Sequence, residues 1–332
     1  MNTKVSNILI TGGAGYIGSH VAERLVKIKS NIIILDNLST GNRKLINKKT
    51  KFIKADLKNI KLLNIVIKKN DIDTIIHLGG NSCVAESEIK KKKYYKNNII
   101  GTLNVVKACK GTHVKNFIFS SSCSIYGNVK EKVNEKSQPN PQSYYAYTKY
   151  KCENIIKKFS NTYKYKYIIL RYFNVAGASK SGEIGEIGNK SGRLIKNLAI
   201  QYFKSKPIIN IHGSNYKTKD GTCVRDYIHV SDIADIHYEC IRYLKKYLKS
   251  TIFNCGYEKG YSVLEIANIF KKIKKNVKIN FIKRRLGDVG QVHADTSKFK
   301  KILKWKPKHN NINLILKSAI KWESKIRYYK GN

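Results

Sequence analysis

The sequence predicts an α/β protein with a doubly wound parallel sheet and a smaller C-terminal α/β lobe. In the first half, short apolar runs rich in β-branched residues alternate with longer helical patterns. The first of these runs leads into a glycine-rich turn that opens a helix. After about residue 175 the alternation gives way to glycine-rich loops. We therefore expect a sheet domain at 1–175 and a substrate lobe mainly at 176–332, with the option that the chain crosses back to the first domain.

The expected strands are almost wholly apolar, as in a parallel sheet covered by helices on both faces. They are Asn7–Thr11, Asn31–Asp36, Phe52–Asp56, Thr74–Leu78, Phe117–Ser121 and Tyr167–Arg171. The helical patterns between them include Tyr16–Lys29, Lys61–Lys69 and Thr102–Cys109. This order of elements is typical of a Rossmann-like sheet.

The composition excludes several classes of protein. Hydrophobic residues make up 42% of the 332 residues, and no apolar run approaches the ~20 residues that a membrane span needs. The N-terminus lacks the apolar segment of a signal peptide, and the seven cysteines are scattered without a Cys-x-x-Cys pair. We expect reduced thiols, a cytoplasmic location and no membrane partner. Cys109 and His113 have helical spacing, but without a second ligand pair we expect no metal site.

The formal net charge of +43 raises the question of nucleic-acid binding. Lysine is spread over the whole chain, however, and no recognition-helix, zinc-finger or aromatic RNA-binding motif accompanies it. A genome rich in A and T would also favour Lys, Asn, Ile and Tyr. We therefore expect a solvated basic surface that attracts anionic ligands, and no specific nucleic-acid partner.

The turn after the first strand predicts a dinucleotide site. Gly12, Gly15 and Gly18 allow a tight turn and a close approach of backbone to a pyrophosphate, which the helix N-terminus also favours. Asp36 ends the second strand, where a carboxylate accepts hydrogen bonds from a ribose and repels a 2′-phosphate. The cofactor predicted is NAD. Asp56 ends the third strand and either contacts the adenine or is a simple turn residue.

Tyr145 and Lys149 are four residues apart on a predicted helix, which would place an ammonium near a phenol and lower the phenol's pKa. Such a tyrosine can take a proton from a sugar hydroxyl while hydride leaves the same carbon. The same spacing recurs at Tyr126/Lys130, Tyr147/Lys151 and Tyr202/Lys206. Ser122 follows the strand Phe117–Ser121, and in doubly wound sheets ligands bind beyond the carboxyl ends of the strands. A serine there can orient the reacting hydroxyl toward a tyrosine.

The glycine turn, Asp36, Ser122 and Tyr145-x-x-x-Lys149 together resemble the extended short-chain dehydrogenase/reductase superfamily. Within it, the chain is most similar to the UDP-glucose 4-epimerases, from about Ile8 to Trp322. The most specific segments are Thr11–His20, Arg171–Asn174, Asp220–Val230 and Arg284–Asp288. Pro141-Gln142-Ser143 precedes the active-site helix as in that family, which selects Tyr145 and Lys149 among the four pairs.

The resemblance implies reversible C4 epimerisation of UDP-glucose and UDP-galactose through a transient 4-keto sugar, with tightly bound NAD and a homodimeric assembly. The implied catalytic residues are Tyr145, Lys149 and Ser122. The implied cofactor contacts are Gly12, Gly15, Tyr16, Ile17, Gly18, Asp36, Asn37, Asp56, Leu57, Leu78, Gly79, Gly80, Asn97, Tyr145, Lys149 and Tyr172. The implied substrate contacts are Ser122, Tyr145, Asn174, Arg193, Leu194, His212, Arg225, Arg285, Asp288 and Val292. For Arg225, the alternative is a salt bridge to its neighbour Asp226.

Several positions depart from the family pattern. Ser82 stands where some members carry Lys, Arg193 where Asn or His is common, and His212 where an aromatic residue is common. Val292 stands where some members have a tyrosine that narrows the sugar pocket. Valine leaves room, so we expect that UDP-GlcNAc and UDP-GalNAc are also candidate substrates.

The nearest alternatives are other nucleotide-sugar enzymes of the same fold. A 4,6-dehydratase needs Asp-Glu just after the hydroxyl position, and a UDP-glucuronate decarboxylase usually keeps a Glu there, whereas this chain has Cys123 and Ser124. A UDP-glucuronate epimerase stays open. A non-catalytic NAD-binding regulator is disfavoured, because regulators of this fold often lose the tyrosine that this chain retains at Tyr145.

Overall fold

A computed structural model describes residues 6–28, 30–129, 131–188 and 192–331. The end of the predicted helix at Lys29 and the Lys130 of one alternative Tyr/Lys pair lie outside the described residues. So do 1–5 and 332, the ends of the two expected domains.

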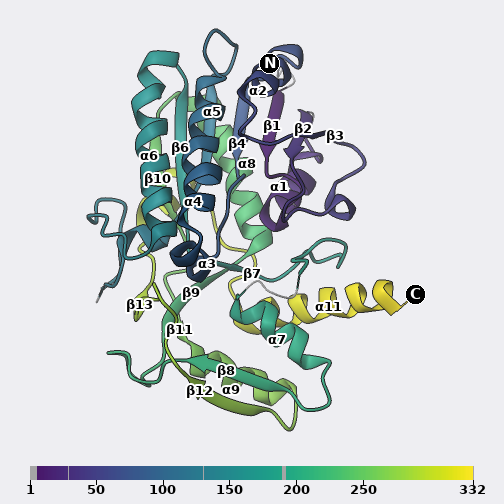
Figure 1. Cartoon of the computed structure of the whole chain (residues 1–332), viewed down its shortest axis with the longest axis vertical. Helices are drawn as coiled ribbons and strands as arrows, with labels where there is room; N and C mark the ends of the chain where they lie inside the picture. The colour runs from purple at the N-terminus through teal and green to yellow at the C-terminus, as the bar shows by residue number, and fades with distance from the viewer. Residues whose placement is uncertain (1–5, 29, 130, 189–191, 332) are drawn as a thin grey trace.

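A seven-stranded parallel sheet is the largest sheet among the described residues (Figure 1). Its strands are β1 (Ser6–Thr11), β2 (Ser30–Asp36), β3 (Lys51–Lys54), β4 (Thr74–His77), β5 (Asn116–Ser122), β6 (Lys166–Tyr172) and β10 (Thr251–Cys255). All six predicted strands are present, and the predicted fold class is confirmed. The sequence analysis missed the seventh, β10, which pairs with β6 although about 80 residues separate the two in the chain.

The strand order is β10-β6-β5-β4-β1-β2-β3. The chain therefore winds outward from β1 in one direction through β2 and β3, and from β4 in the other through β5 and β6. The winding direction changes between β1 and β4. At such a point the connections run to opposite faces of the sheet and leave a crevice at the carboxyl ends of the central strands. This topology places the predicted glycine turn after β1 and the predicted Ser122 at the end of β5 on the same edge of the sheet.

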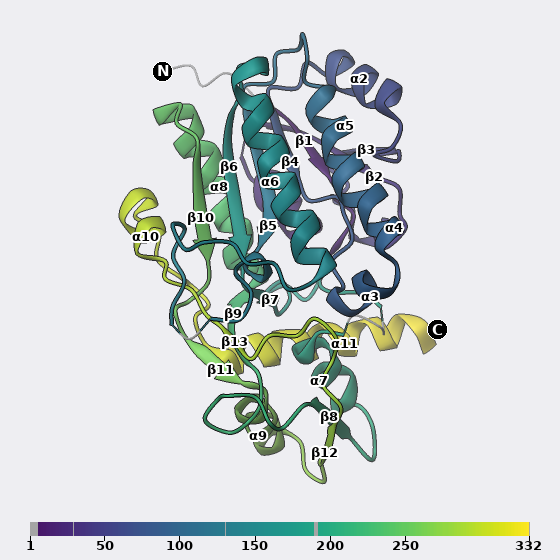
Figure 2. The ribbon, with the colours of Figure 1, turned by 60° about the vertical axis from the view of Figure 1, so that its left-hand side comes forward.

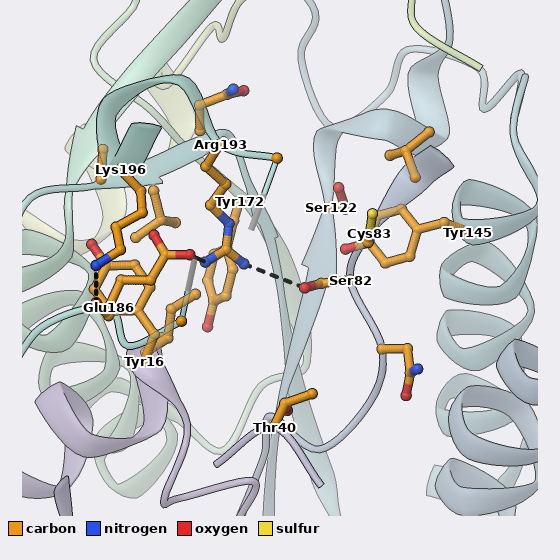
Figure 3. A pocket seen from close by; sticks show the side chains of 18 of the residues that line it. Tyr16, Thr40, Ser82, Cys83, Ser122, Tyr145, Tyr172, Glu186, Arg193 and Lys196 are labelled. Carbon is orange, nitrogen blue, oxygen red and sulfur yellow. Dashed lines mark hydrogen bonds and ion pairs between the residues drawn. The ribbon is translucent and has the colours of Figure 1, made fainter. Parts of the chain in front are cut away.

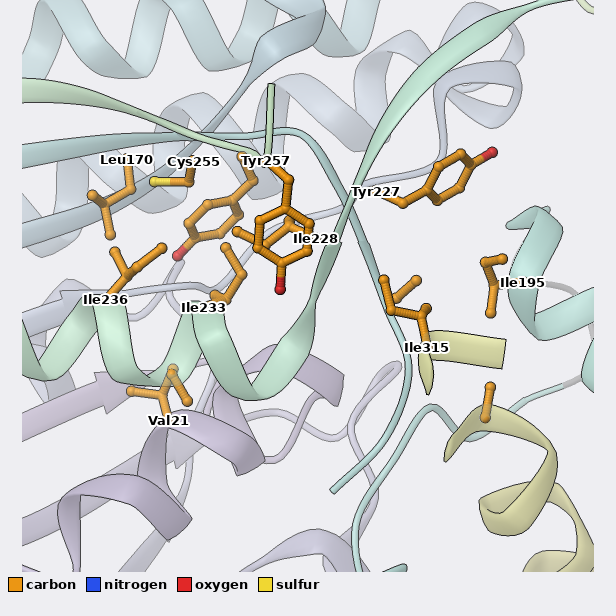
Figure 4. Packing of buried hydrophobic residues seen from close by; sticks show 14 of the residues in the cluster. Val21, Leu170, Ile195, Tyr227, Ile228, Ile233, Ile236, Cys255, Tyr257 and Ile315 are labelled. Atoms are coloured by element: carbon orange, nitrogen blue, oxygen red, sulfur yellow. The ribbon is translucent and has the colours of Figure 1, made fainter. Parts of the chain in front are cut away.

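Helices cover both faces of the sheet. On one face lie α1 (Tyr16–Leu25) and α8 (Val230–Tyr247), and Figure 4 shows Val21 of α1 and Ile233 of α8 in the apolar layer beside Leu170 of β6. On the other face lie α2 (Ile60–Lys69), α5 (Gly101–Lys107) and α6 (Tyr144–Tyr163), which bury a second apolar cluster (Figure 2). Short segments complete this half: η1 (Arg43–Leu45), α3 (Val84–Ile89), α4 (Lys91–Tyr94), the π-helical η2 (Tyr95–Ile100) and η3 (Cys123–Tyr126).

A smaller lobe lies beyond the carboxyl edge of the sheet (Figures 1 and 2). Its strands are β7 (Asn174–Ala176), β9 (Val224–His229), β11 (Gly260–Ser262) and β13 (Gln291–Val292) in one sheet, and β8 (Ile208–His212) with β12 (Lys278–Ile282) in another. Its helices are α7 (Leu194–Tyr202), α9 (Val263–Ile273) and α11 (Ile312–Gly331), whereas α10 (Ser297–Leu303) packs against β10 and α8 of the larger half. The chain leaves the large sheet after β6, returns for α8 and β10, and returns again for α10 before it ends in α11.

Local sequence explains where the site helices begin. Ser143 caps α6 by accepting a hydrogen bond from the Ala146 backbone N–H at 3.2 Å, as expected for a serine before a helix. The predicted helices Lys61–Lys69 and Thr102–Cys109 correspond to α2 and α5, while α1 ends at Leu25 with its cap at Val26. Within the described ranges, no helix combines the length and apolar character needed to cross a membrane.

Candidate active site

A cavity of about 1780 Å³ lies at the carboxyl edge of the large sheet and reaches into the lobe. It is lined by every residue that the sequence analysis assigned to a catalytic, cofactor or substrate role. Its cofactor half comes from the turns after β1, β2 and β4. Its substrate half comes from α7, β8, β9, β13 and the loop before β13. One continuous space therefore connects the glycine turn with the predicted substrate contacts.

The glycine turn after β1 is built without room for side chains. Gly12 has a φ of +71°, and a Cβ there would lie 2.7 Å from the Gly79 nitrogen. A Cβ on Gly18 would lie 2.3 Å from the Gly12 carbonyl oxygen. Backbone N–H groups at the start of α1 thus face the cavity with nothing bulky in front of them, which fits a dinucleotide pyrophosphate.

The carboxylate at the end of β2 is the second feature that fits the dinucleotide. Asp36 is 8% exposed, and its oxygens accept hydrogen bonds from the backbone N–H groups of Ala14 at 3.1 Å and Leu38 at 2.8 Å. Burial raises the pKa of Asp36, opposed by these two bonds. Asp56 accepts a 3.0 Å hydrogen bond from the Asn37 amide, so this carboxylate is held by more than its own turn. The Asp36 carboxylate, fixed beside the glycine turn, is suited to accept hydrogen bonds from the two hydroxyls of a ribose.

The other side of the cofactor half follows β4. Leu78, Gly79 and Gly80 line it there, and the Leu57 side chain would meet a Cβ on Gly79 at 2.7 Å. The Asn97 amide donates to the Asn81 side-chain oxygen at 3.0 Å and ties η2 to this turn. Tyr16 and Ile17, from the first turn of α1, also line the space.

The predicted catalytic residues Ser122, Tyr145 and Lys149 all line the cavity. Figure 3 shows the Tyr145 ring beside Ser122, and Cys83 lines the same cavity. The α6 segment is held at its start because the Tyr145 backbone N–H donates to the Ser87 hydroxyl of α3 at 3.0 Å. Lys149 is buried one helical turn later.

The pKa of Tyr145 and the direction of the Lys149 side chain both differ from the simple helical-spacing expectation. Burial raises the pKa of Tyr145 to about 12, and a hydrogen bond with Ser122 and the charge of Arg193 oppose that rise. The Lys149 ammonium donates to the Ser120 carbonyl at 2.7 Å and lies 4.8 Å from the centre of the Phe119 ring. Burial lowers the pKa of Lys149 to about 8. Helical spacing placed the two residues correctly, but it did not fix where the ammonium points.

The three alternative tyrosines lie elsewhere. Tyr126 is buried and donates to the Asn254 side-chain oxygen at 2.7 Å. Tyr147 is 41% exposed on the outer side of α6, and Tyr202 lies at the end of α7. Of the four tyrosines with this spacing, Tyr145 is the one that lines the described cavity.

Arg193, immediately before α7, reaches across the cavity (Figure 3). Its guanidinium donates to Glu186 at 2.8 Å and to the Ser82 hydroxyl at 3.3 Å, and it lies 5.6 Å from the centre of the Tyr16 ring. Glu186 was not predicted as a site residue. It lies in a glycine-rich loop that the sequence analysis noticed, but no spacing rule connects a carboxylate there with a cation seven residues later.

Arg225 lies on β9 and is held by backbone. It donates to the carbonyl oxygens of Val224 at 2.9 Å, Gly290 at 3.3 Å and Val289 at 2.7 Å, and lies 4.0 Å from the Asp288 carboxylate. The alternative salt bridge to Asp226 is wrong, because the Asp226 carboxylate accepts hydrogen bonds from three backbone N–H groups of other segments. Burial raises the pKa of Asp226 to about 6.

The remaining predicted substrate residues line the same cavity. Arg285 donates to the Gly192 carbonyl at 2.8 Å, and Arg284 instead binds the Asn215 side chain at 2.8 Å, outside the cavity lining. Leu194 opens α7, Asn174 opens β7 and His212 ends β8. Val292 pairs with Arg225 across β13 and β9 and is 2% exposed, within an apolar cluster that includes Cys123.

Two further features concern cysteines and metals. All seven cysteines are free thiols, six of them buried and Cys83 partly exposed at the cavity. Cys109 donates to the Val105 carbonyl at 3.3 Å, and His113 contacts Asp71. No group of three or more metal-ligating side chains occurs among the described residues.

Comparison with known proteins is consistent with this geometry. Residues 8–256 match the NAD dependent epimerase/dehydratase family. A UDP-glucose 4-epimerase of Lactobacillus helveticus is 39% identical over 317 residues, which cover 95% of this chain and 96% of that protein.

Two solved structures are similar over nearly the whole chain. The UDP-glucose-4-epimerase of Stenotrophomonas maltophila, with bound NAD and formylated UDP-arabinopyranose, has a TM-score of 0.92 at 30% identity and covers 98% of this chain and 99% of its own. The UDP-Glc/GlcNAc 4-epimerase of Campylobacter jejuni has a TM-score of 0.82 at 38% identity, with 96% and 99% covered. Because the family match spans most of the chain and these similarities span nearly all of it, this protein belongs to the NAD dependent epimerase/dehydratase family.

Proposed function

We propose that this protein interconverts UDP-glucose and UDP-galactose by reversible epimerisation at C4 of the sugar. The observation that carries the proposal is one continuous cavity whose lining includes the glycine turn, Ser122, Tyr145 and the arginines of the lobe. A redox acid/base placed between a dinucleotide site and a diphosphate site is what oxidation and reduction of a nucleotide sugar requires. The similarity to UDP-glucose 4-epimerases supports the same assignment.

NAD would be held by the turn at Gly12, Gly15 and Gly18, by Asp36 at the adenosine ribose and by Lys149 at the nicotinamide ribose. When bound, NAD would supply the hydride acceptor and donor for C4 of the sugar. The net redox change is zero, so the cofactor stays resident. The narrow glycine turn and the buried Asp36 favour tight retention.

Tyr145 would take the proton of the sugar 4-hydroxyl and give it back after the 4-keto sugar has turned. Ser122, which hydrogen-bonds Tyr145, would orient that hydroxyl. Because burial raises the pKa of Tyr145, the phenol holds its proton at neutral pH unless positive charge or a hydrogen-bonded path compensates. The hydroxyls of Ser122 and Ser124, 2.9 Å apart, offer such a path.

The nucleotide must be gripped while the sugar turns. Arg225 and Arg285 would bind the diphosphate, since guanidinium groups suit it, and Asp288 a uridine ribose hydroxyl. Asn174 would contact the phosphates, and Leu194 and His212 the uracil. Arg225 is already oriented by three carbonyl oxygens, so little side-chain freedom remains to be lost on binding.

A second substrate class follows from Val292. This small side chain lines the cavity beside Cys123, and we propose that UDP-GlcNAc and UDP-GalNAc are accepted as well. The similar Campylobacter jejuni protein is named a UDP-Glc/GlcNAc 4-epimerase. Val292→Tyr should selectively slow the N-acetylated substrates; equal slowing of both substrate pairs would contradict this reading.

A homodimer, a cytoplasmic location and a role in galactose metabolism belong to the same proposal and rest on the family resemblance. Size-exclusion chromatography with light scattering would test the dimer.

The decisive experiment incubates purified protein with UDP-galactose without added NAD and follows UDP-glucose by chromatography. Tyr145→Phe should lower turnover roughly 10²–10⁴-fold, because it removes the acid/base group without changing the ring. Tyr147→Phe is the matched control, two residues away on the exposed side of α6, and should leave turnover unchanged. No conversion by the wild-type protein would overturn the proposed function.

A further inference from the structure

Arg193 connects the two halves of the cavity. It directly precedes α7 of the lobe, and Figure 3 shows its guanidinium between Glu186 and Ser82. The guanidinium donates to Glu186 at 2.8 Å and to the hydroxyl of Ser82, in the turn after β4, at 3.3 Å. It also lies 5.6 Å from the centre of the Tyr16 ring, and Tyr16 opens α1 directly after the glycine turn. The charge of Arg193 is therefore placed between the turns after β1 and β4, which both line the cofactor half.

We propose that Arg193 is a ligand of the NAD pyrophosphate and retains the cofactor by joining the lobe to the sheet half over it. Arg193 thereby moves from the predicted substrate contacts to the cofactor half, whereas Arg225 and Arg285 keep the substrate diphosphate. This role rests on the NAD site of the proposed function and not on the reaction that the protein performs there.

The first reason is the charge that a pyrophosphate brings into this half of the cavity. The pyrophosphate of NAD is dianionic at neutral pH, and the carboxylates of Asp36 and Asp56 line the same half. The N-terminus of α1 offers only roughly half an elementary charge. A guanidinium stays charged at any working pH and binds phosphate oxygens through a fork of N–H donors, so Arg193 can balance what the helix does not.

The second reason is where other cations of the cavity lining are bound. Lys149 donates to the end of β5, Lys196 to α11, Arg225 to the loop before β13 and Arg285 to the loop before α7. Among the described lysines and arginines of the lining, Arg193 is the one with contacts to the turns after both β1 and β4. It is therefore the cation best placed for a group that lies between these turns.

The third reason is that Arg193 is anchored in the lobe. Its partner Glu186 is buried, and the Glu186 carbonyl accepts a 2.9 Å hydrogen bond from the Trp322 indole of α11. Tyr16 is tied to the lobe as well, because its hydroxyl donates to the Gly177 carbonyl at 2.6 Å. A pyrophosphate bound by Arg193 would leave only after these contacts across the cavity have opened. Arg193 should therefore slow the dissociation of NAD.

The test is the exchange of resident NAD in the purified holoprotein. Isotopically labelled NAD is added in excess, and its replacement of the unlabelled cofactor is followed by mass spectrometry. Arg193→Gln should speed up the exchange roughly 10–100-fold, the effect of losing a charged hydrogen bond to phosphate. Arg284→Gln is the matched control. It removes the same charge, but Arg284 binds Asn215 outside the cavity lining, so exchange should stay at the wild-type rate.

A second variant separates the charge from any effect on folding. The Arg193 side chain is 39% exposed, so its replacement leaves no buried cavity. Because the guanidinium lies 3.3 Å from the Ser82 hydroxyl, Ser82→Lys brings an ammonium to nearly the same point from the sheet half. The double variant Arg193→Gln/Ser82→Lys should exchange NAD roughly fivefold more slowly than Arg193→Gln. Equal rates in the two variants would contradict a role for the charge at this point.

The pyrophosphate is identified by comparing ligands that contain it with one that lacks it. NAD and ADP-ribose share the pyrophosphate, and adenosine has none. In calorimetric titrations of the full chain freed of NAD, Arg193→Gln should weaken NAD and ADP-ribose equally and leave the Kd for adenosine unchanged. Equal weakening of all three ligands would make Arg193 a structural contact and overturn the proposal. So would weaker binding of UDP with unchanged NAD and ADP-ribose, which would return Arg193 to the substrate contacts.

These measurements need no turnover, so their failure is distinguishable from failure of the proposed function. If NAD retention depends on Arg193 in a protein that does not epimerise UDP-galactose, the proposed function falls while the Arg193 assignment stands. Epimerisation of UDP-galactose together with unchanged NAD exchange in Arg193→Gln overturns the Arg193 assignment alone.

Discussion

The two halves of the cavity differ in how far apart in the sequence their contacting residues lie. The cofactor half is built from consecutive strand, turn and helix, so that the segment from β1 to Asp36 completes the glycine turn and its carboxylate within about 30 residues. The substrate half is assembled from segments far apart in the chain: Arg225 is oriented by carbonyls 64 and 65 residues away, and Arg193 by Ser82, 111 residues away. The cofactor half should therefore survive changes that loosen the substrate half.

The largest effect is expected from a buried ion pair between β6 of the large sheet and α6. Arg171 donates to both oxygens of Glu153, at 3.0 Å and 2.8 Å, and Ser121 donates to the same carboxylate at 2.6 Å. Arg171→Leu removes the buried, two-bonded partner of the Glu153 carboxylate and leaves it the partly exposed Lys157 at 3.7 Å. The loss should cost about 3–5 kcal/mol in the free energy of unfolding, measured by urea denaturation.

Arg242→Leu is the control for that loss, since its pair with Glu239 is exposed and should contribute less than about 1 kcal/mol. Equal losses for the two variants would mean that the Arg171 pair does not support the sheet.

A smaller, local effect is expected from the buried pair in the substrate half. Lys196 of α7 donates to Glu323 of α11 at 2.6 Å and to the Glu186 carbonyl at 2.8 Å. Lys196→Met should cost about 3 kcal/mol, at the low end for such pairs because Arg327 lies 3.4 Å from Glu323 and compensates in part.

The discriminating measurement for Lys196→Met is hydrogen exchange by mass spectrometry. Faster exchange should be confined to α7 and α11 while retained NAD stays at the wild-type level. Faster exchange in β1 and α1 as well would show that the stability of the cofactor half depends on that of the substrate half.

One added carbon atom in the glycine turn should be enough to weaken NAD binding. A Cβ at Gly18 would overlap the Gly12 carbonyl at 2.3 Å and displace the turn. Gly18→Ala should weaken NAD binding by roughly 100-fold, about 2.7 kcal/mol, measured as NAD released from the denatured protein and by titration of the emptied one.

Gly111→Ala is the matched control for that loss. Its Cβ meets nothing within 4 Å, so it should cost about 1 kcal/mol of stability from its φ of +66° and leave NAD bound. If the Gly18→Ala protein retained NAD, the glycine turn would not be part of the cofactor site.

The same difference in sequence separation explains which features could be predicted from the sequence. The six strands, the glycine turn and Asp36 follow from patterns within one strand–turn–helix unit, and the structure contains them all. Strand β10 pairs with β6 after an excursion of about 80 residues through the lobe, and no local pattern indicates such a return. Side-chain direction and burial were equally hidden: spacing placed Lys149 beside Tyr145, yet its ammonium points to Ser120 and burial raises the pKa of the phenol.

The smallest effect tests how the cofactor half selects its dinucleotide. The Asp36 carboxylate is fixed by the Ala14 and Leu38 N–H groups, so its charge stays near the adenosine ribose and should repel a 2′-phosphate. Asp36→Asn keeps the size of the side chain and removes the charge. The ratio of Kd for NADP to Kd for NAD should fall by about tenfold, or about 1.4 kcal/mol, measured by fluorescence titration. Asp56→Asn removes a similar charge at the next strand and should leave the ratio unchanged, because Asp56 is paired with Asn37. If both variants shifted the ratio equally, discrimination would come from the general negative potential of this edge and not from the Asp36 contact.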